Sequence, residues 1–353
     1  MTTIVAGTTF SSSVVIAYPN GGRLAYSTVR SLIAFDQAID LQWEIRTCDV
    51  NGGNLTTLTV GLAGLPDGHR GNPSWSPNGN WIVFQACTFQ DDLAGPGFGT
   101  PGLGAGHDIY IASYPGLVVT KLTDVVDASG GVLHPHFNHD GTELWWAQKE
   151  TGGDNRWFIA KADFSNVGGV PTLSNKMFYK PRGNGLYETH PLGSAYALFS
   201  HSAAGTSAEP GLNVYRVAAS DLTSNPVTIE GDTAGGADQH WHEHGHPNPS
   251  VTHILYMTSR LTGVADPWSG DLLTDVLKVA IADPAAEGDQ ITDFDNPASA
   301  TYQADVTQPI AGDMAFIDED TLLVYCFDGP PTLAEYAGTV TRPGKIVKII
   351  ATA

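Results

Sequence analysis

The sequence predicts an all-β protein, a six-bladed β-propeller built from four-stranded antiparallel blades. Three observations predict this fold. One strand–turn–strand pattern recurs along the chain, no segment sustains a helical period of apolar residues, and glycine and proline are abundant, with 40 and 22 copies among 353 residues. Because the repeats use the chain from end to end, we expect one domain over residues 1–353.

The clearest copy of the pattern is Asn72–Ala86. Within it, Pro77–Asn80 is a turn in which Asn and Gly accept positive φ, and Trp81–Phe84 is a β-branched and aromatic strand. Five other segments repeat the pattern at intervals of 56 to 62 residues: Ser12–Thr28, His134–Gln148, His190–Ser202, His246–Ser259 and Gln308–Asp328. This spacing predicts blades at about 8–64, 65–126, 127–182, 183–238, 239–300 and 301–353.

A further apolar strand follows each copy. These strands are Trp43–Arg46, Asp108–Ile111, Arg156–Ile159, Asn213–Arg216, Val276–Val279 and Lys345–Lys348. The last one leaves the sixth unit with only three strands, whereas Thr2–Ala6 is a β-branched segment ahead of the first unit. We therefore expect Thr2–Ala6 to supply the outer strand of the last blade and close the ring.

Composition excludes some classes of partner. Lys and Arg number 17 against 37 Asp and Glu, which gives a formal net charge of −20. This acidity argues against nucleic acid and anionic membrane surfaces as partners. The sequence has no apolar run of 18 residues, so it predicts no membrane insertion. Cys48, Cys87 and Cys326 form no metal or disulfide spacing, so we expect buried free thiols. No signal peptide is visible. The sequence therefore does not identify the cellular compartment, and an extracytoplasmic mature form is one of the alternatives.

The long loop at residues 89–106 is rich in glycine. A glycine-rich loop can bind phosphate, but this one lacks the Gly-Lys-Ser/Thr sequence and the following helix that such a site needs. The sequence therefore predicts no nucleotide or organic cofactor.

Histidines mark the candidate site. His134, His190 and His246 occupy one repeat position in three consecutive units, each before a proline; the other units carry Ser12, Asn72 and Gln308 there. Because the inner strands of a propeller begin at one rim of the channel, these positions are expected to line it, together with Arg70 and Glu188 two residues earlier. Unit five adds the run DQHWHEHGHP at residues 238–247, in which alternate histidines share one face of an extended strand. Three interpretations stay open: a divalent metal site, a polar channel that binds only water, and surface histidines. His107, His139 and His253 fall at predicted turns and are expected at the surface.

The segment PSWSPNGNWIVF at residues 73–84 resembles the repeat of TolB-like (WD-repeat-like) β-propellers. The resemblance covers the whole chain, strongly in units two and three and loosely elsewhere. It implies the fold but no single function, since such propellers serve as interaction platforms, peptidase caps and lyases.

A second, local resemblance is to the oligogalacturonate lyases, which are TolB-like propellers that hold a metal with a His-x-His pair, a further His and a Gln. His244-Gly245-His246 is similar to that pair. The resemblance implies a divalent metal (Mn, Zn or Ca) bound by residues from His190, Gln239, His242, His244 and His246, with Gln308 as the alternative to Gln239 for the amide. It further implies β-elimination, with His134 as the base and Arg70 stabilising the developing enolate. Seven blades in that family against six units here, and the net charge of −20, oppose this reading.

Two functions therefore remain. The favoured one is a binding platform whose channel mouth recognises a protein or a glycan, with a metal as an optional component. The alternative is a metal-dependent lyase that acts on an acidic saccharide, so the sequence leaves open whether the protein is an enzyme.

Overall fold

A computed structural model describes the fold of most of the chain. The described residues are 9–16, 21–39, 42–87, 104, 106–125, 130–149, 157–179, 188–192, 196–202, 212–218, 220, 227–230, 242–259, 273–282, 289–292, 297–299, 303, 309–328 and 344–352.

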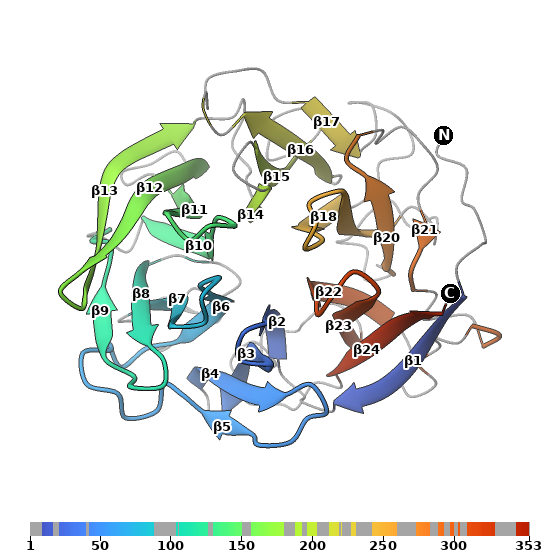
Figure 1. Cartoon of the computed structure of the whole chain (residues 1–353), viewed down its shortest axis with the longest axis horizontal. Coiled ribbons are helices and arrows are strands. Elements are labelled where there is room, and N and C mark those ends of the chain that lie inside the picture. Colours follow the sequence, from blue (N-terminus) through green and yellow to red (C-terminus); the bar gives the residue numbers. More distant parts are fainter. Residues whose placement is uncertain are drawn as a thin grey trace.

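Six four-stranded antiparallel sheets stand around a central axis (Figure 1). All 24 secondary-structure elements of the described residues are strands, so the prediction of an all-β propeller is confirmed. None of the described elements is a helix that could cross a membrane. The innermost strands contact one another in the order β2, β6, β10, β14, β18 and β22, and β22 contacts β2, which closes the circle.

We number the sheets as blades in chain order. Blades 1 to 3 consist of β2 (Gly21–Ser27), β3 (Leu32–Ile39), β4 (Gln42–Asp49) and β5 (Thr56–Thr57); β6 (Arg70–Trp75), β7 (Trp81–Cys87), β8 (His107–Ser113) and β9 (Val119–Lys121); and β10 (Gly131–Phe137), β11 (Glu143–Lys149), β12 (Trp157–Val167) and β13 (Val170–Tyr179).

The remaining blades follow the same plan. Blades 4 to 6 consist of β14 (Glu188–Leu192), β15 (Tyr196–Ser202), β16 (Leu212–Ala218) and β17 (Val227–Glu230); β18 (His242–Pro247), β19 (His253–Thr258), β20 (Asp275–Ala280) and β21 (Asp289–Gln290); and β22 (Pro309–Phe316), β23 (Thr321–Asp328), β24 (Gly344–Thr352) and β1 (Thr9–Ile16).

The start of the chain differs from the predicted frame. The fourth strand of blade 6 is β1, which pairs with β24 from Thr9↔Thr352 to Ile16↔Ile346. The segment Ser12–Thr28 is therefore not one strand–turn–strand copy: its first half belongs to blade 6, and blade 1 begins only at Gly21. The predicted closing strand, Thr2–Ala6, lies outside the described residues.

The turn after each inner strand explains the repeated sequence. In blade 2, Gly79 takes a φ of 66° and donates to the Ser76 carbonyl at 2.9 Å, while the Ser76 amide donates to the Trp81 carbonyl. Blade 3 repeats these bonds, with the Gly141 amide donating to the Asn138 carbonyl. Glycine suits this position because positive φ costs it no steric penalty. The turn thus fixes the register of the first hairpin of each of these two blades.

A threonine ties the outer strand of three blades to its neighbour. In blade 2 the Ile109 amide donates to Thr123 Oγ1 at 2.8 Å, and this hydroxyl donates to Asp108 Oδ1 at 2.8 Å. Thr59 with Glu44 in blade 1 and Thr292 with Asp275 in blade 5 form the same pair of bonds. In blade 2 this carboxylate accounts for the polar residue, Asp108, at the start of the predicted third strand.

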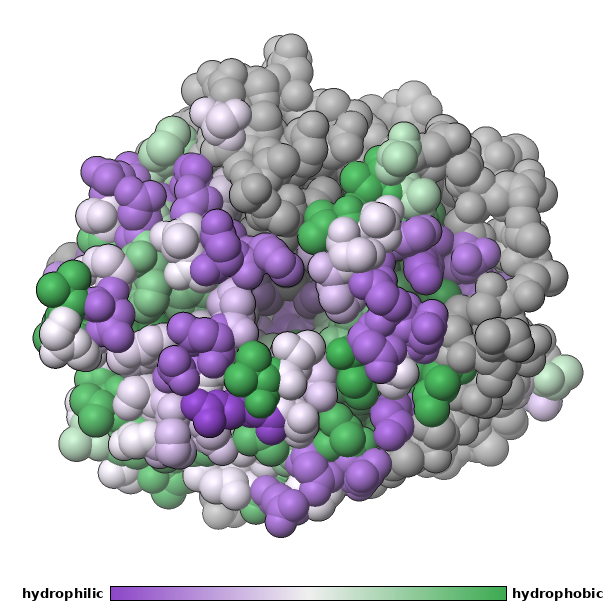
Figure 2. Space-filling model, in the orientation of Figure 1, coloured by the Kyte–Doolittle hydropathy of each residue, from purple (hydrophilic) through white to green (hydrophobic). Residues whose placement is uncertain are grey.

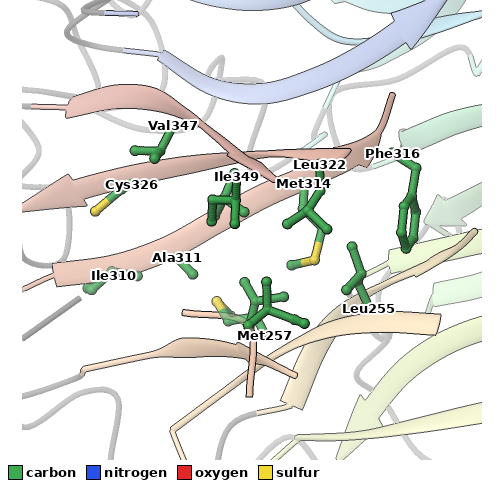
Figure 3. Packing of buried hydrophobic residues seen from close by; sticks show 13 residues of the cluster. Leu255, Met257, Ile310, Ala311, Met314, Phe316, Leu322, Cys326, Val347 and Ile349 are labelled. Carbon is green, nitrogen blue, oxygen red and sulfur yellow. The ribbon is translucent and has the colours of Figure 1, made fainter. Parts of the chain in front are cut away.

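Apolar side chains fill the spaces between neighbouring blades. The cluster in Figure 3 joins Leu255, Met257 and Val276 of blade 5 to residues of blade 6 such as Met314, Val324 and Ile349. Equivalent clusters join blades 6 and 1, 1 and 2, and 2 and 3. The three cysteines are buried free thiols, as predicted. Burial between blades therefore holds the ring together and leaves the axis to other residues.

Candidate functional site

The channel wall is polar, in contrast to the interfaces between blades. Figure 2 shows a hollow at the centre of the ring with hydrophilic residues around it. The inner strands β6, β10 and β18 carry a β-bulge near their starts, and the bulged residues Asn72, His134 and His244 have φ values of 52°, 51° and 58°. Bulges bend a strand and re-aim its side chains. Asn and His tolerate positive φ better than most residues, which fits their presence at these positions.

Side chains of the preceding blade hold two of these bulges. The Asn72 amide donates to Asp36 Oδ2 at 2.8 Å, and the His134 amide donates to Gln85 Oε1 at 3.3 Å. Gln85 Oε1 also accepts from Asn72 Nδ2 at 2.7 Å. Because Asp36 and Gln85 are both buried, these bonds fix the backbone from which the channel side chains project.

Histidines of blades 3 and 5 meet in two pairs. The ring centroids of His134 and His244 are 6.3 Å apart, and those of His136 and His246 are 6.4 Å apart. Blade 4 lies between these two blades in the ring, so each pair forms through the channel rather than across an interface of adjacent blades.

Arg23 of blade 1 joins the first pair. Its Nη1 lies 2.6 Å from His244 Nε2 and 2.9 Å from Nδ1 of the same ring. A guanidinium only donates hydrogen bonds, so His244 is the acceptor in this contact. Alternate blades 1, 3 and 5 therefore each contribute one side chain to this layer.

Asp313 of blade 6 joins the second pair. Its Oδ1 lies 2.8 Å from His246 Nε2, and its carboxylate also accepts from the backbone amides of Leu24 and Met314, each at 2.9 Å. A carboxylate bonded in this way fixes the orientation of the imidazole. We call Arg23, His134, His136, His244, His246 and Asp313 the channel cluster.

Burial changes the acidity of Asp36 beneath the cluster. Desolvation raises the pKa of Asp36 to about 6, against the opposing effect of hydrogen bonds from the Asn72 and Arg23 amides and of the charge on Arg23. Asp313 contributes a smaller upward effect on this pKa. The carboxyl group therefore gains its proton near pH 6 rather than near pH 4.

The structure changes the alignment of the histidines. In the predicted repeat, His246 was the equivalent of His134 because both precede proline. The register shifts after Leu133 and after Glu243 instead make His244 the equivalent of His134, and His246 the equivalent of His136. The bulge, and not the proline, defines the equivalent position, so this part of the predicted frame was wrong by two residues.

The other predicted residues lie in several places. Arg70 is buried between blades 1 and 2, where it donates to Glu44 Oε1 at 2.9 Å and to the Pro66 carbonyl. His242 is fully buried with its ring centroid 6.0 Å from that of Tyr256. His107, the first residue of β8, is also fully buried and pairs with Cys87 of β7, so its prediction as a surface residue was wrong. It lies on the strand itself and not in the loop before it. His139 is exposed in a turn.

Four predicted site residues lie wholly or partly outside the part of the chain that the structure describes. The backbone of Glu188 and His190 belongs to β14, but nothing is described of their side chains. Gln239 and Gln308 lie outside the described residues.

A metal does not fit the described part of the channel cluster. Among the described residues, no three His, Cys, Asp or Glu side chains come together in a metal-binding arrangement. Arg23 also occupies the side of His244 from which a cation would bind, because its guanidinium faces both ring nitrogens.

The sequence missed three members of the cluster: Arg23, His136 and Asp313. Arg23 fell within the segment Ser12–Thr28 but was not singled out; it lies near the start of β2. A signal was present, since Gly22-Arg23 and Gly312-Asp313 both follow the last paired residue before a bulge. A glycine followed by a charged residue thus marks the bulge in blades 1 and 6.

Comparisons with known proteins bear on the fold. No family model matches the sequence, and the search of curated proteins gives no match. Among solved structures, the chain is similar to a putative TolB from Agrobacterium tumefaciens at 14% identity, over 82% of this chain and 90% of that one, with a TM-score of 0.52. It also matches an oligogalacturonate lyase in complex with manganese, at 12% identity over 100% and 98% of the two chains, with a TM-score of 0.49.

A third similar structure is TolB from Acinetobacter baumannii, at 15% identity and a TM-score of 0.47, with 76% of this chain matched; the chain spans only 55% of that TolB. The match to the putative TolB, with its TM-score above 0.5, confirms the predicted resemblance to TolB-like propellers at the level of the fold. At these identities the comparisons establish the fold alone, and function has to be argued from the site.

Proposed function

We propose that the protein is a ligand-binding propeller that recognises a protein segment or a glycan at the mouth of its channel. The channel cluster is the observation that carries this proposal. Side chains of blades 1, 5 and 6 meet there through contacts of 2.6 to 2.9 Å, and two imidazoles of blade 3 lie with their ring centroids 6.3 and 6.4 Å from those of blade 5. The spaces between blades are filled by apolar residues instead.

Backbone strain in the channel wall supports a role for it beyond stability. Three buried non-glycine residues take positive φ at matching bulges, and such strain of about 1–3 kcal/mol each tends to be retained where function needs it. Polar groups fixed in advance also suit recognition, because little entropy is lost when a ligand binds.

The test is a binding screen with an internal control. We expect the purified protein to bind members of an array of acidic and neutral oligosaccharides or of a peptide library, and the double variant His136→Ala/His246→Ala to lose the same interactions at least tenfold. The variant Ser165→Ala, on the outer hairpin of blade 3, is the control and should bind normally. Equal binding by the two variants would place recognition elsewhere on the surface.

An alternative is a metal-dependent lyase that acts on an acidic saccharide. It is favoured by one observation: His134, the proposed base, is buried in the channel with a φ of 51° and has a second imidazole beside it. Its Mn, Zn or Ca ion would need ligands beyond those described, for which His190 and Gln239 are the candidates from the sequence. A bound metal would acidify the C–H beside the uronate carboxylate.

Two measurements separate the alternatives. β-Elimination leaves a double bond conjugated to the carboxylate, so turnover of an acidic oligosaccharide is visible as rising ultraviolet absorbance. Element analysis after incubation with manganese or zinc measures the metal. Less than about a tenth of an equivalent of metal, together with flat absorbance, excludes the lyase and leaves the binding function untouched.

A further inference from the structure

We propose that the turns of blades 1 and 2 around Arg30 form a docking surface for a protein segment in which a carboxylate stands beside apolar side chains. We call residues 27–31, 76–80 and 113–118 the turn surface. These residues cover the ends of β2, β6 and β8 in two neighbouring blades (Figure 1), whereas the bulges beside the channel cluster lie near the starts of the inner strands. The turn surface is therefore a second site, and this inference does not depend on the proposed function.

Arg30 holds the three turns together. Its Nε donates to the Gly79 carbonyl at 2.8 Å, and its Nη2 donates to Asn80 Oδ1 at 3.1 Å. The Tyr114 amide donates to the Asn80 carbonyl at 2.8 Å, and the Tyr114 ring has its centroid 5.5 Å from Arg30 Cζ. Gly79 gives the arginine room, since a Cβ there would lie 3.0 Å from Arg30 Cγ. The guanidinium is thus fixed before a ligand binds, which reduces the entropy lost on binding.

The positive charge of Arg30 has no carboxylate beside it among the described residues. Its hydrogen bonds go to two carbonyl oxygens and one side-chain amide oxygen, and its Nη1 makes none within that part of the chain. The three turns contain no Asp or Glu, although the chain has 37. The turn of blade 6 at residues 318–320 is acidic instead, and Asp140, in the adjacent turn of blade 3, accepts from Thr142 Oγ1 at 2.8 Å. A half-buried guanidinium with an unused nitrogen favours a carboxylate, which it can bind through two parallel hydrogen bonds.

Apolar side chains stand beside this arginine on the surface. Val29 precedes it and is 59% exposed, and Val118, in the turn that carries Tyr114, is 67% exposed. Tyr114 is half-buried and packs edge-on against Trp75, with ring centroids 5.1 Å apart. A partner that covers these side chains removes apolar area from water, and Arg and Tyr are among the residues that contribute most to binding at protein interfaces.

The combination of groups selects the kind of partner. A small anion would contact the guanidinium alone, and a glycan offers few apolar groups to the valines. A protein segment with acidic and apolar side chains matches both features of the turn surface.

The experiment selects peptides from a displayed library of random sequences on the whole protein, with Arg30→Ala in a parallel selection. We expect the parent protein to enrich peptides in which Asp or Glu has apolar neighbours, and Arg30→Ala not to enrich them. Synthetic copies of these peptides, titrated by fluorescence polarisation, should bind Arg30→Ala about ten- to hundredfold more weakly, as the loss of a hydrogen bond between charged groups predicts. Replacing the acidic residue of the peptide by its amide should cost a similar factor.

Variants of the exposed valines separate binding from folding, because Arg30 also joins two blades. Val29→Ser and Val118→Ser leave the hydrogen bonds of Arg30 in place, so they should unfold at the temperature of the parent protein and bind the peptides about fivefold more weakly. Val167→Ser is the matched control, since Val167 is 76% exposed on the outer hairpin of blade 3, and it should bind like the parent protein. Arg30→Lys keeps the charge but loses the fork and should recover only part of the affinity.

Several outcomes would overturn the docking surface. These are no enrichment of peptides, enriched peptides without an acidic residue, equal binding by a folded Arg30→Ala, and equal losses in Val29→Ser and Val167→Ser. If Arg30→Ala does not fold, the valine variants decide. Light scattering measures the oligomeric state, and a dimer of the parent protein that Arg30→Ala converts to a monomer would identify a second copy of the chain as the occupant and overturn the proposed partner.

One variant distinguishes this site from the channel. His136→Ala/His246→Ala should bind the selected peptides like the parent protein, because the turn surface contains neither histidine. A loss shared by this double variant and Arg30→Ala would overturn the separate site. Peptides that depend on Arg30 alone would support it even where the channel screens stay negative and the proposed function fails.

Discussion

The spaces between blades and the wall of the channel are both buried, but the first are apolar and the second is polar. Trp146, between blades 2 and 3, is 0% exposed and packs in an apolar cluster; His134, on the neighbouring inner strand, is 3% exposed and lies in a polar one. The apolar spaces follow the repeat of the sequence, since each blade supplies the same strands. The channel wall departs from the repeat, because blades 1, 2, 3 and 5 carry Arg23, Asn72, His134 and His244 at or beside their bulges. The repeat therefore specifies the ring, and the departures from it specify the site.

The bulge connects the two regions. In β10, Val132 belongs to the cluster between blades 2 and 3, whereas His134, two residues later, faces His244 in the channel. A regular strand would keep residues i and i+2 on one face. The extra residue of the bulge allows one short strand to serve the apolar interface and the polar channel in turn.

The largest effect is expected from the apolar side of this comparison. Trp146→Ala should lower the free energy of unfolding by about 3–5 kcal/mol, because a fully buried indole is lost and the space cannot close completely. Urea unfolding followed by tryptophan fluorescence measures it. Ligand binding in the oligosaccharide and peptide screens by the fraction that stays folded should not change, since Trp146 is not part of the channel cluster.

Trp146→Phe is the matched control for this variant. It keeps most of the packed volume but loses the hydrogen bond from Nε1 to Gln148 Oε1, which measures 3.0 Å. We expect it to be clearly more stable than Trp146→Ala. A loss below about 1 kcal/mol for Trp146→Ala would contradict the view that packing between blades holds the ring.

The second prediction concerns the polar side and its dependence on pH. The pKa of Asp36 is about 6 in the folded protein and ordinarily 3.8, so the folded state favours the protonated form. Its contribution to stability is complete below about pH 4 and is lost as pH rises through about 6. The stability of the parent protein relative to Asp36→Asn should therefore fall by about 2 kcal/mol between pH 4 and pH 7.

Urea midpoints of both proteins at several pH values within this range test the prediction. Titration of the histidines contributes to both curves and cancels in the difference. A difference that stays constant with pH, or that rises toward pH 7, would show that Asp36 is not the buried acid the structure describes.

How much could be predicted follows from the same comparison. The run Trp81–Phe84 predicted β7 because an aromatic and β-branched segment after an Asn-Gly turn has few other structures open to it. Ser12–Thr28 was assigned to one blade, since Val14–Ile16 and Leu24–Tyr26 both read as strands and local sequence does not say with which strand each one pairs. The tertiary closure between β1 and β24 decides that.

The site was less accessible to prediction than the ring. That His134 and His246 lie at the channel could be inferred from their repeat position, and that His244 lies there from the alternating histidines of unit five. Their pairing could not, because a bulge shifts the register by one residue and leaves no fixed sequence mark. Arg23 and Asp313 were not singled out for a related reason: they lie in the bulges of inner strands, at positions that the repeat frame did not mark.

The smallest expected effect on stability concerns the outer strands, which blades 2 and 3 hold in different ways. Blade 2 ties its three-residue outer strand β9 with Thr123, while blade 3 has a ten-residue outer strand, β13, that continues from β12 through a turn in which Gly168 and Gly169 take φ values of 64° and 86°. Thr123→Val should cost about 2 kcal/mol, because two hydrogen bonds worth about 1 kcal/mol each are lost and the buried Ile109 amide keeps no acceptor there.

Ser165→Ala is the matched change in blade 3. It removes the exposed 2.8 Å hydrogen bond between Ser165 Oγ and Thr172 Oγ1, and we expect a change within about 0.5 kcal/mol. Amide hydrogen exchange localises both effects: Thr123→Val should speed exchange at Leu122, whose amide donates to the Ile109 carbonyl, but not in the inner strand β6. Equal costs for the two variants would mean that the threonine does not hold the outer strand, and that the ladder between β8 and β9 suffices. Faster exchange in β6 would instead show that outer strand and channel wall open together, which would remove the independence of the two regions.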